Sequence, residues 1–159
     1  MKYFLDTEFY EFVDELGRGV IWPISIGIVA DDDRCYYAEF ADFDWSAADD
    51  WLTQNVLPHM IGQPLSRRVI AQQIQAFVVA DNEPEFWAYV GSYDWVVLMQ
   101  IFGKLTNRPA NWPNRFHELK DVIDHAGLTK HDLPTQIGSL HRAIDDAYWN
   151  REAYRFVMG

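Results

Sequence analysis

The chain opens with Lys2-Tyr3-Phe4-Leu5-Asp6-Thr7-Glu8-Phe9, an apolar and aromatic run that two acids interrupt. Residues of this kind predict a β-strand over residues 2–9. Side chains alternate between the faces of a strand, so Asp6 and Glu8 point to the same face. Two carboxylates on one face of an apolar strand repel each other unless a cation lies between them. The pair therefore marks either a strand edge that faces solvent or a site for Mg²⁺ or Mn²⁺.

Two more strands are expected after this first one. The apolar segment from Ile21 to Ala30 predicts a second strand, and the segment from Arg34 to Phe40 predicts a third. Asp31-Asp32-Asp33 is the predicted turn between them, and the acidic segment from Glu11 to Gly19 is expected to form an exposed loop. Three strands joined in this way form an antiparallel meander.

The pattern then changes to the spacing of helices, with further short strands between them. The predicted elements are helices over Ala47–Val56, Ser66–Val79 and Tyr93–Phe102, a buried strand over Phe86–Val90, a strand-and-helix stretch from Arg115 to His125, and a last helix from about Leu140 to Val157. This order predicts a single α/β domain over residues 1–159. Its mixed sheet has three antiparallel strands first, then parallel strands, and is flanked by helices.

Composition limits the kinds of protein this chain can be. Of its 159 residues, 49% are hydrophobic and 16% are aromatic, enough for a packed core. The net charge of −11 is opposite to that of proteins that bind long duplexes by neutralising phosphates, so a nucleic acid would need a local site. The single cysteine, Cys35, excludes an internal disulfide and fits the cytoplasm. The longest apolar run is too short for a bilayer, which takes about 20 residues, so we expect a soluble protein.

Asp94 is a third candidate acid, placed after the predicted buried strand and the Gly91-Ser92 turn. A carboxylate at the start of a helix is favoured by the helix dipole, and this alone can explain it. It can equally be a ligand at the carboxyl end of a strand, where open sheets place their sites. The two roles are compatible.

A histidine and two more acids open the last predicted helix, in His141-Arg142-Ala143-Ile144-Asp145-Asp146. At about 100° per residue, Asp146 lies beside the apolar stripe of the helix, whereas Asp145 points further toward solvent. Asp146 is therefore the expected inward acid. His141 and Asp146 do not share a helical face, so we expect His141 on the preceding loop or the first turn.

These motifs, in this order, resemble those of the DEDDh exonucleases of the ribonuclease H-like superfamily. The likeness covers nearly the whole chain and is greatest to the compact exoribonuclease subgroup typified by RNase AS. The segments that carry it are Tyr3–Phe9 and Glu85–Asp94. The segment from His141 to Asp146 resembles the wider family that includes oligoribonuclease.

The resemblance implies a role for each of these residues. Two divalent cations, Mg²⁺ or Mn²⁺, would be held by Asp6, Glu8, Asp94 and Asp146, with Asp6 bridging the two. His141 would act as the general base. The reaction would release nucleoside 5′-monophosphates from the 3′ ends of single-stranded RNA. A preference for adenylate-rich ends and a homodimer are implied in the same way.

Three further residues are expected to contact the substrate: Thr7, Phe9 and Glu118. Phe9 either stacks on the terminal base or belongs to the core. His117 and Glu118 lie where the family approaches the base. Glu118 is expected to accept a hydrogen bond from an adenine amino group, unless it is a solvated acid at a helix start.

Two other functions stay open on the sequence. A DNA 3′-5′ exonuclease of the same fold would carry the same acids, because Asp-x-Glu and His-x4-Asp do not distinguish the two sugars. A non-catalytic nucleic-acid-binding domain could keep the fold, but it would have no need of four acids and His141 together.

Overall fold

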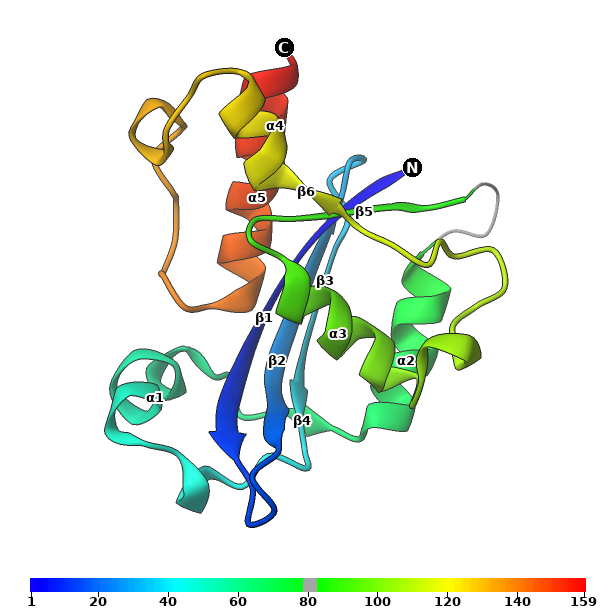
Figure 1. Cartoon of the computed structure of the whole chain (residues 1–159), viewed down its shortest axis with the longest axis vertical. Helices are drawn as coiled ribbons and strands as arrows, with labels where there is room; N and C mark the ends of the chain where they lie inside the picture. Colours follow the sequence, from blue (N-terminus) through cyan, green and yellow to red (C-terminus); the bar gives the residue numbers. More distant parts are fainter. Residues whose placement is uncertain (79–82) are drawn as a thin grey trace.

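The computed structural model describes residues 1–78 and 83–159, and within these residues six strands form one mixed sheet in the order β4-β3-β2-β1-β5-β6 (Figure 1). The strands are β1 (Lys2–Val13), β2 (Gly19–Ala30), β3 (Cys35–Phe40), β4 (Pro64–Leu65), β5 (Glu85–Ala88) and β6 (His117–Glu118). β1, β2 and β3 are antiparallel, whereas β5, β6 and β4 each run parallel to a neighbour. This is the ribonuclease H-like mixed sheet that the sequence predicts.

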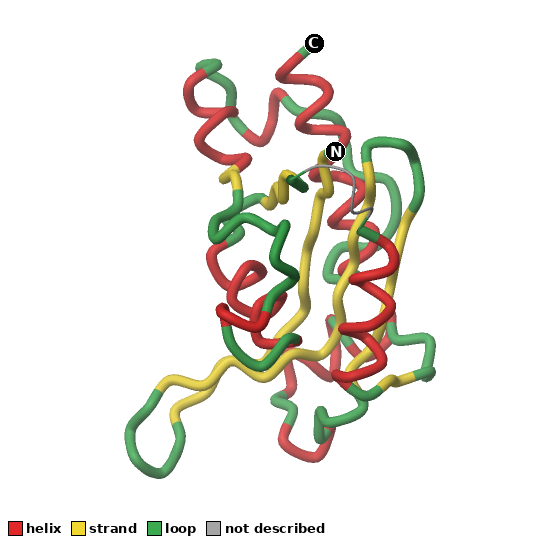
Figure 2. Tube along the Cα trace, turned by 90° about the vertical axis from the view of Figure 1, so that its right-hand side faces the viewer, coloured by secondary structure: helices red, strands yellow, loops and turns green. Residues whose placement is uncertain are grey.

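The hairpin of β1 and β2 is longer than predicted, and it projects from the body of the molecule (Figure 2). The prediction of an exposed loop from Glu11 to Gly19 is wrong at both ends, because only residues 14–18 lie outside the two strands. Beyond the predicted end of the first strand, Phe12 still pairs with Val20 of β2. Cross-strand pairs of aromatic and β-branched residues stabilise a sheet, and they extend the ladder past the acidic residues.

The helices cover both faces of the sheet (Figure 1). They are α1 (Asp50–Asn55), α2 (Arg67–Phe77), α3 (Ser92–Ile101), α4 (Leu119–His125) and α5 (Ala143–Met158). The main core cluster joins α2 and α3 to one face of the sheet, while smaller clusters join α1 and α5 to the other face. α4 packs beside α5. Among the residues described, no helix has the length and apolar character needed to cross a membrane.

Helix boundaries differ from the predictions for local reasons. α1 begins at Asp50 and not at Ala47, because Asp49 caps it through a side-chain hydrogen bond. α5 begins later than predicted, because His141 has a φ of +62°, which is outside the right-handed helical region. The predicted end of the second helix, Val79, lies outside the described residues.

One glycine sets the distance between α5 and the sheet. Gly27 of β2 pairs with Asp6 of β1, and a side chain at position 27 would overlap the carbonyl group of Ala143, the first residue of α5. The close approach places the first turn of α5 over the middle of β1, where Asp6 lies.

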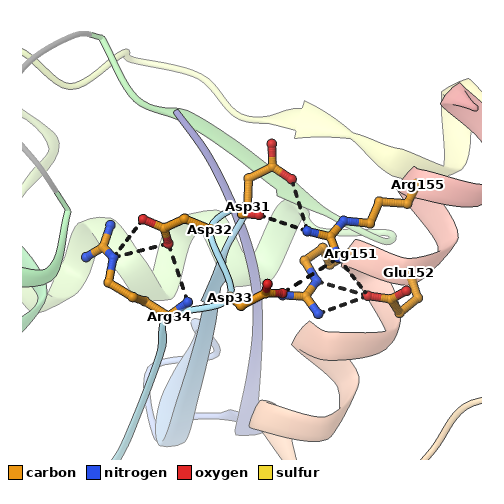
Figure 3. A network of polar contacts seen from close by, with 7 residues as sticks. All are labelled: Asp31, Asp32, Asp33, Arg34, Arg151, Glu152 and Arg155. Atoms are coloured by element: carbon orange, nitrogen blue, oxygen red, sulfur yellow. Dashed lines mark hydrogen bonds and ion pairs between the residues drawn. The ribbon is translucent and has the colours of Figure 1, made fainter.

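Further along, α5 is fixed to the turn between β2 and β3 by a network of ion pairs (Figure 3). Arg151 is only 7% exposed, and its guanidinium lies 2.7 Å from a carboxylate oxygen of Asp33 and 3.0 Å from one of Glu152. Arg155 donates a 2.8 Å hydrogen bond to the carbonyl of Asp31. A buried guanidinium is tolerated when it is paired in this way. α5 is therefore held against β2 at its first residue, by the close approach at Gly27, and in its second half, by the ion pairs with the turn that follows β2.

Candidate active site

The candidate site lies where β1 loses its neighbouring strand. Lys2–Phe4 pair with Glu85–Trp87 of β5, but after Ala88 the chain turns away toward α3. Val90 in this turn has a φ of +53°, which shortens the strand predicted to reach it. One edge of β1 from Leu5 to Glu8 therefore has no strand partner among the described residues.

Two side chains satisfy the backbone groups that this edge leaves free. Asn150 of α5 is 2% exposed, and its Nδ2 donates a 2.9 Å hydrogen bond to the carbonyl of Leu5. The Oδ1 atom of Asp94, in the first turn of α3, accepts hydrogen bonds from the backbone N–H of Thr7 at 2.7 Å and from its hydroxyl at 2.6 Å. Buried backbone groups require such partners. The bonds attach α5 and α3 to β1 beside the predicted acids.

Asp6, Glu8 and Asp146 converge at this point. One carboxylate oxygen of each lies within 4.8 Å of those of the other two. Asp6 and Glu8 extend from β1, and Asp146 comes from the first turn of α5. Oxygen donors this close together fit a single divalent cation, which binds such ligands at roughly 2.0–2.6 Å. Asp94 lies next to this group and not within it, because its Oδ1 is turned toward β1.

Burial and neighbouring negative charges raise the pKa values of the two acids on β1, Glu8 and Asp6. Burial raises the pKa of Glu8 to about 8, and the charges of Asp146 and Asp94 add to the effect. Burial also raises the pKa of Asp6 well above its ordinary value, with further increases from Asp94, Asp146 and Glu8. The negative charges of Asp94 and Asp146 thus act on both Asp6 and Glu8. A cation among them would relieve both the desolvation and the repulsion.

Neighbouring groups moderate this effect at the two outer acids. Burial raises the pKa of Asp94 to about 6, although the hydrogen bonds from Thr7 act in the opposite direction. Burial likewise raises the pKa of Asp146, against the hydrogen bond from Gln136 and the charge of His141. Both acids keep more of their anionic character than burial alone would allow.

His141 lies beside the cluster, on the loop immediately before α5 as its spacing predicts. Its ring contacts the ring of Trp51 of α1, with centroids 4.9 Å apart and an edge-to-face angle of 75°. A positive φ is uncommon for a residue other than glycine and persists where the surroundings hold it in place. The contact with Trp51 is one such restraint.

The two adjacent acids of α5 differ in their surroundings. Asp146 belongs to the carboxylate cluster, as the helical geometry predicts. Asp145 lies outside this cluster; its side chain is 17% exposed and accepts a 2.9 Å hydrogen bond from the backbone N–H of Ser139. The same carboxylate lies 3.6 Å from the guanidinium of Arg142. Asp145 thus fixes the loop that leads into α5.

Glu118 has a clear structural function. Its Oε1 accepts hydrogen bonds from the backbone N–H groups of Val90 at 2.7 Å and Lys120 at 3.0 Å, and its Oε2 accepts one from Gly91 at 3.0 Å. These bonds hold the turn that leads to Asp94. The predicted contact of Glu118 with adenine stays a prediction.

The other predicted substrate contacts lie around the same edge. Thr7 uses its hydroxyl to hold Asp94. The ring of Phe9 lies 5.4 Å from the ring of Tyr93, at the start of α3. His117 stacks on Trp87 at 4.6 Å, with an angle of 16° between the rings. The substrate roles of Thr7 and Phe9 stay predictions.

Three residues of the site escaped the sequence analysis: Gly27, Asn150 and Gln136. The Nε2 atom of Gln136 donates a 2.9 Å hydrogen bond to Asp146. Gly27 and Asn150 contact segments far along the chain, and Gln136 contacts α5 from the loop that precedes it. None of the three belongs to a spacing pattern. An isolated glycine in a strand is a weak sign of close backbone approach, and it was the one available signal.

Comparison with known proteins identifies the family of the chain. Residues 1–158 match the family described as the 3′-5′ exoribonuclease Rv2179c-like domain. Two relatives are 3′-5′ exoribonuclease Rv2179c of Mycobacterium tuberculosis strain H37Rv and 3′-5′ exoribonuclease MT2234.1 of strain CDC 1551. Each is 34% identical over 163 residues, which cover 99% of this chain and 93% of the relative. The chain therefore belongs to the Rv2179c-like 3′-5′ exoribonuclease domain family.

Proposed function

We propose that this chain is a 3′-5′ exoribonuclease that uses divalent cations to release nucleoside 5′-monophosphates from single-stranded RNA. The observation that carries the proposal is the convergence of Asp6, Glu8 and Asp146, with Asp94 beside them. The activity printed in the names of the two relatives supports it. The resemblance to the DEDDh exonucleases, and within them to the RNase AS subgroup, supports it as well.

The donor set fits Mg²⁺ or Mn²⁺, because it consists of carboxylate oxygens alone. Asp6, Glu8 and Asp146 would hold one ion, and Asp6 with Asp94 would hold a second. When bound, the two ions stabilise the negative charge on the attacking and leaving oxygens of an in-line displacement at phosphorus. The raised pKa values of Asp6 and Glu8 show that their charged forms are unfavourable without a nearby positive charge, and a bound cation would supply that charge.

The protein's own side chains supply position and proton transfer. His141 takes the proton of the attacking water, a role for which histidine is the most common side chain. The ring of Trp51 contacts the imidazole ring of His141 from one side and restrains it. Thr7 fixes Asp94, and Gln136 fixes Asp146, so that both carboxylates keep their places when the substrate arrives.

The substrate class rests on the relatives and on the resemblance. Both support RNA, and the resemblance also supports a preference for adenylate-rich 3′ ends and a homodimer. A cytoplasmic location is the expectation from the single cysteine.

Digestion of single-stranded RNA and DNA of identical sequence tests the proposal. Each strand carries a 5′ label and is incubated with Mg²⁺, with Mn²⁺ or with EDTA. We expect RNA to shorten stepwise from its 3′ end with either metal and to stay intact in EDTA and with the Asp6→Asn variant. Faster loss of DNA would make the protein a DNA exonuclease. Binding without cleavage under all conditions would make it a non-catalytic domain.

A further inference from the structure

An aromatic pocket lies on the projecting hairpin, beyond the carboxylate cluster. It has a volume of about 320 Å³ and is lined by Tyr10, Phe12, Val13, Trp22 and Ala47. We call it the hairpin pocket. Tyr10, Phe12 and Trp22 are partly exposed, so part of this aromatic surface is accessible to a ligand. None of the five lining side chains carries a charge, so the pocket suits an uncharged planar group better than a phosphate.

The hairpin pocket continues the face of β1 that carries the acids. Side chains alternate along a strand, so Asp6, Glu8, Tyr10 and Phe12 all lie on one face. The pairing of β1 with β2 is irregular at Glu8, but the extra residue belongs to β2, and the alternation of β1 is kept. At about 3.4 Å per residue, Tyr10 lies about 7 Å and Phe12 about 14 Å beyond Glu8 along the strand.

The rings of the pocket are held in a fixed arrangement. Those of Tyr10 and Phe12 are stacked, with centroids 5.5 Å apart and planes at 25°. The ring of Trp22 lies 6.1 Å from that of Phe12, and its Nε1 donates a 3.0 Å hydrogen bond to the carbonyl of Asp42. Rings fixed in this way lose little freedom when another planar group stacks on them.

The negative net charge of the protein means that affinity for RNA must come from contacts other than phosphate neutralisation. With a net charge of −11, the chain has no general attraction for the RNA backbone, so the release of counterions cannot supply most of the affinity. Stacking of bases on aromatic side chains is the alternative that tolerates any sequence. It changes affinity by about 5- to 150-fold for each base.

We propose that the hairpin pocket binds a nucleobase of the substrate on the 5′ side of the scissile linkage. This inference rests on the proposed function. An exonuclease must let a strand of any length leave its site, and the hairpin projects away from the body of the molecule, so a strand that follows the hairpin leads out of the site (Figure 2). A nucleotide of an extended strand is roughly twice as long as its 3.4 Å rise in a duplex, so the distance of about 14 Å between Glu8 and Phe12 spans two nucleotides. The base that Phe12 binds is therefore the third from the 3′ end, which a dinucleotide lacks.

The dependence of hydrolysis on substrate length tests the proposal. The kcat/KM is measured for di-, tri-, tetra- and hexanucleotides with the wild type, Phe12→Leu, Phe12→Tyr and Phe156→Leu. Phe156 is exposed at the far end of α5 and serves as a matched control. We expect Phe12→Leu to lose at least about fivefold more on the hexanucleotide than on the dinucleotide. Phe12→Tyr and Phe156→Leu should follow the wild type. The same length dependence in Phe12→Leu and the wild type would overturn the proposal.

A binding measurement separates this inference from the proposed function. The inactive Asp6→Asn variant is mixed with oligouridylates that carry a single 2-aminopurine at successive positions, because stacking on a protein ring quenches this base. We expect quenching at the third nucleotide from the 3′ end, and its loss when Phe12→Leu is added. Quenching that Phe12→Leu leaves unchanged would overturn the inference. So would a change of oligomeric state in Phe12→Leu with unchanged RNA binding, because the pocket would then be an interface between copies of the chain.

Discussion

Thr7 donates both its backbone N–H and its hydroxyl to the same oxygen of Asp94, at 2.7 and 2.6 Å. Both bonds favour the charged carboxylate and lower its pKa against the effect of burial. Because Thr7 lies between Asp6 and Glu8, the strand that carries two of the acids also orients a third. This relationship leads to the first prediction.

Thr7→Val keeps the size of the side chain and the backbone bond but removes the hydroxyl. A hydrogen bond to a charged group contributes about 1.5–3 kcal/mol, so we expect kcat to fall by roughly 10- to 100-fold. The pKa of Asp94 should rise, which moves the acidic limb of the pH–rate profile to higher pH. Thr7→Ser, which keeps the hydroxyl, should retain the wild-type profile. An unshifted profile in Thr7→Val would contradict this role.

Glu8 should make the metal-free protein less stable as the pH rises. Its pKa is 4.5 in the unfolded chain and about 8 in the folded protein, so between these values the folded state binds the proton more tightly. The stabilisation is complete below pH 4.5 and is lost as the pH rises through 8. In EDTA, we expect Tm to fall over this range, by roughly 2–4 °C for each kcal/mol lost.

The matched variant for this measurement is Glu8→Gln, which cannot lose a proton. Its Tm should exceed that of the wild type at pH 8 in EDTA, while its activity is lost. Addition of Mg²⁺ should raise the Tm of the wild type more than that of the variant. Equal slopes of Tm against pH in the two proteins would show that Glu8 is not the group responsible.

His141 and Trp51 should act as a pair. His141→Ala is expected to lower kcat by about 10²–10⁴, as loss of a general base does. Trp51 is 50% exposed, so Trp51→Ala should leave Tm nearly unchanged, yet lower kcat because the imidazole loses a restraint. Trp51→Phe should retain most of the rate.

The double variant decides whether the effect of Trp51 runs through His141. In the His141→Ala background, Trp51→Ala should cost little further activity, because its partner is already absent. If the two losses multiply in full, Trp51 acts independently, for example on the substrate.

Gly27→Ala should displace α5 from the sheet, because the added methyl group would overlap the carbonyl of Ala143. We expect a loss of about 1–3 kcal/mol in the free energy of unfolding and a weaker affinity for Mn²⁺. Gly19→Ala is the control, since nothing lies within 4 Å of a side chain added there. Wild-type affinity for Mn²⁺ in Gly27→Ala would show that the cluster does not depend on this close approach.

The parts of the site that sequence alone predicts are those whose geometry is local. Asp6 and Glu8 share a face because strand side chains alternate. Asp146 is separated from Asp145 by the rotation of a helix, and the same rotation predicts that His141 lies before that helix, because His141 would not share a face with Asp146. Each of these placements needs only the residue spacing and the type of element.

The parts that sequence misses depend on how elements dock. The hairpin was predicted too short because residues 11–13 look like a loop until their partners on β2 are known. Asn150 meets the carbonyl of Leu5 across 145 positions of the chain, and no local pattern indicates it. Asp145 accepts a hydrogen bond from Ser139 in the loop before α5, a contact that helical spacing does not indicate.

The burial of the four acids also affects the binding of a divalent cation. Glu8, with a pKa of about 8, keeps its proton near neutrality, and Asp94, with a pKa of about 6, keeps its proton in mildly acidic solution; each must give up its proton to coordinate an ion. Uptake of Mg²⁺ or Mn²⁺ would therefore release protons, and the heat of binding in titration calorimetry would depend on the ionisation enthalpy of the buffer. The apparent affinity for the ion would increase with pH, because fewer protons then compete for the carboxylates.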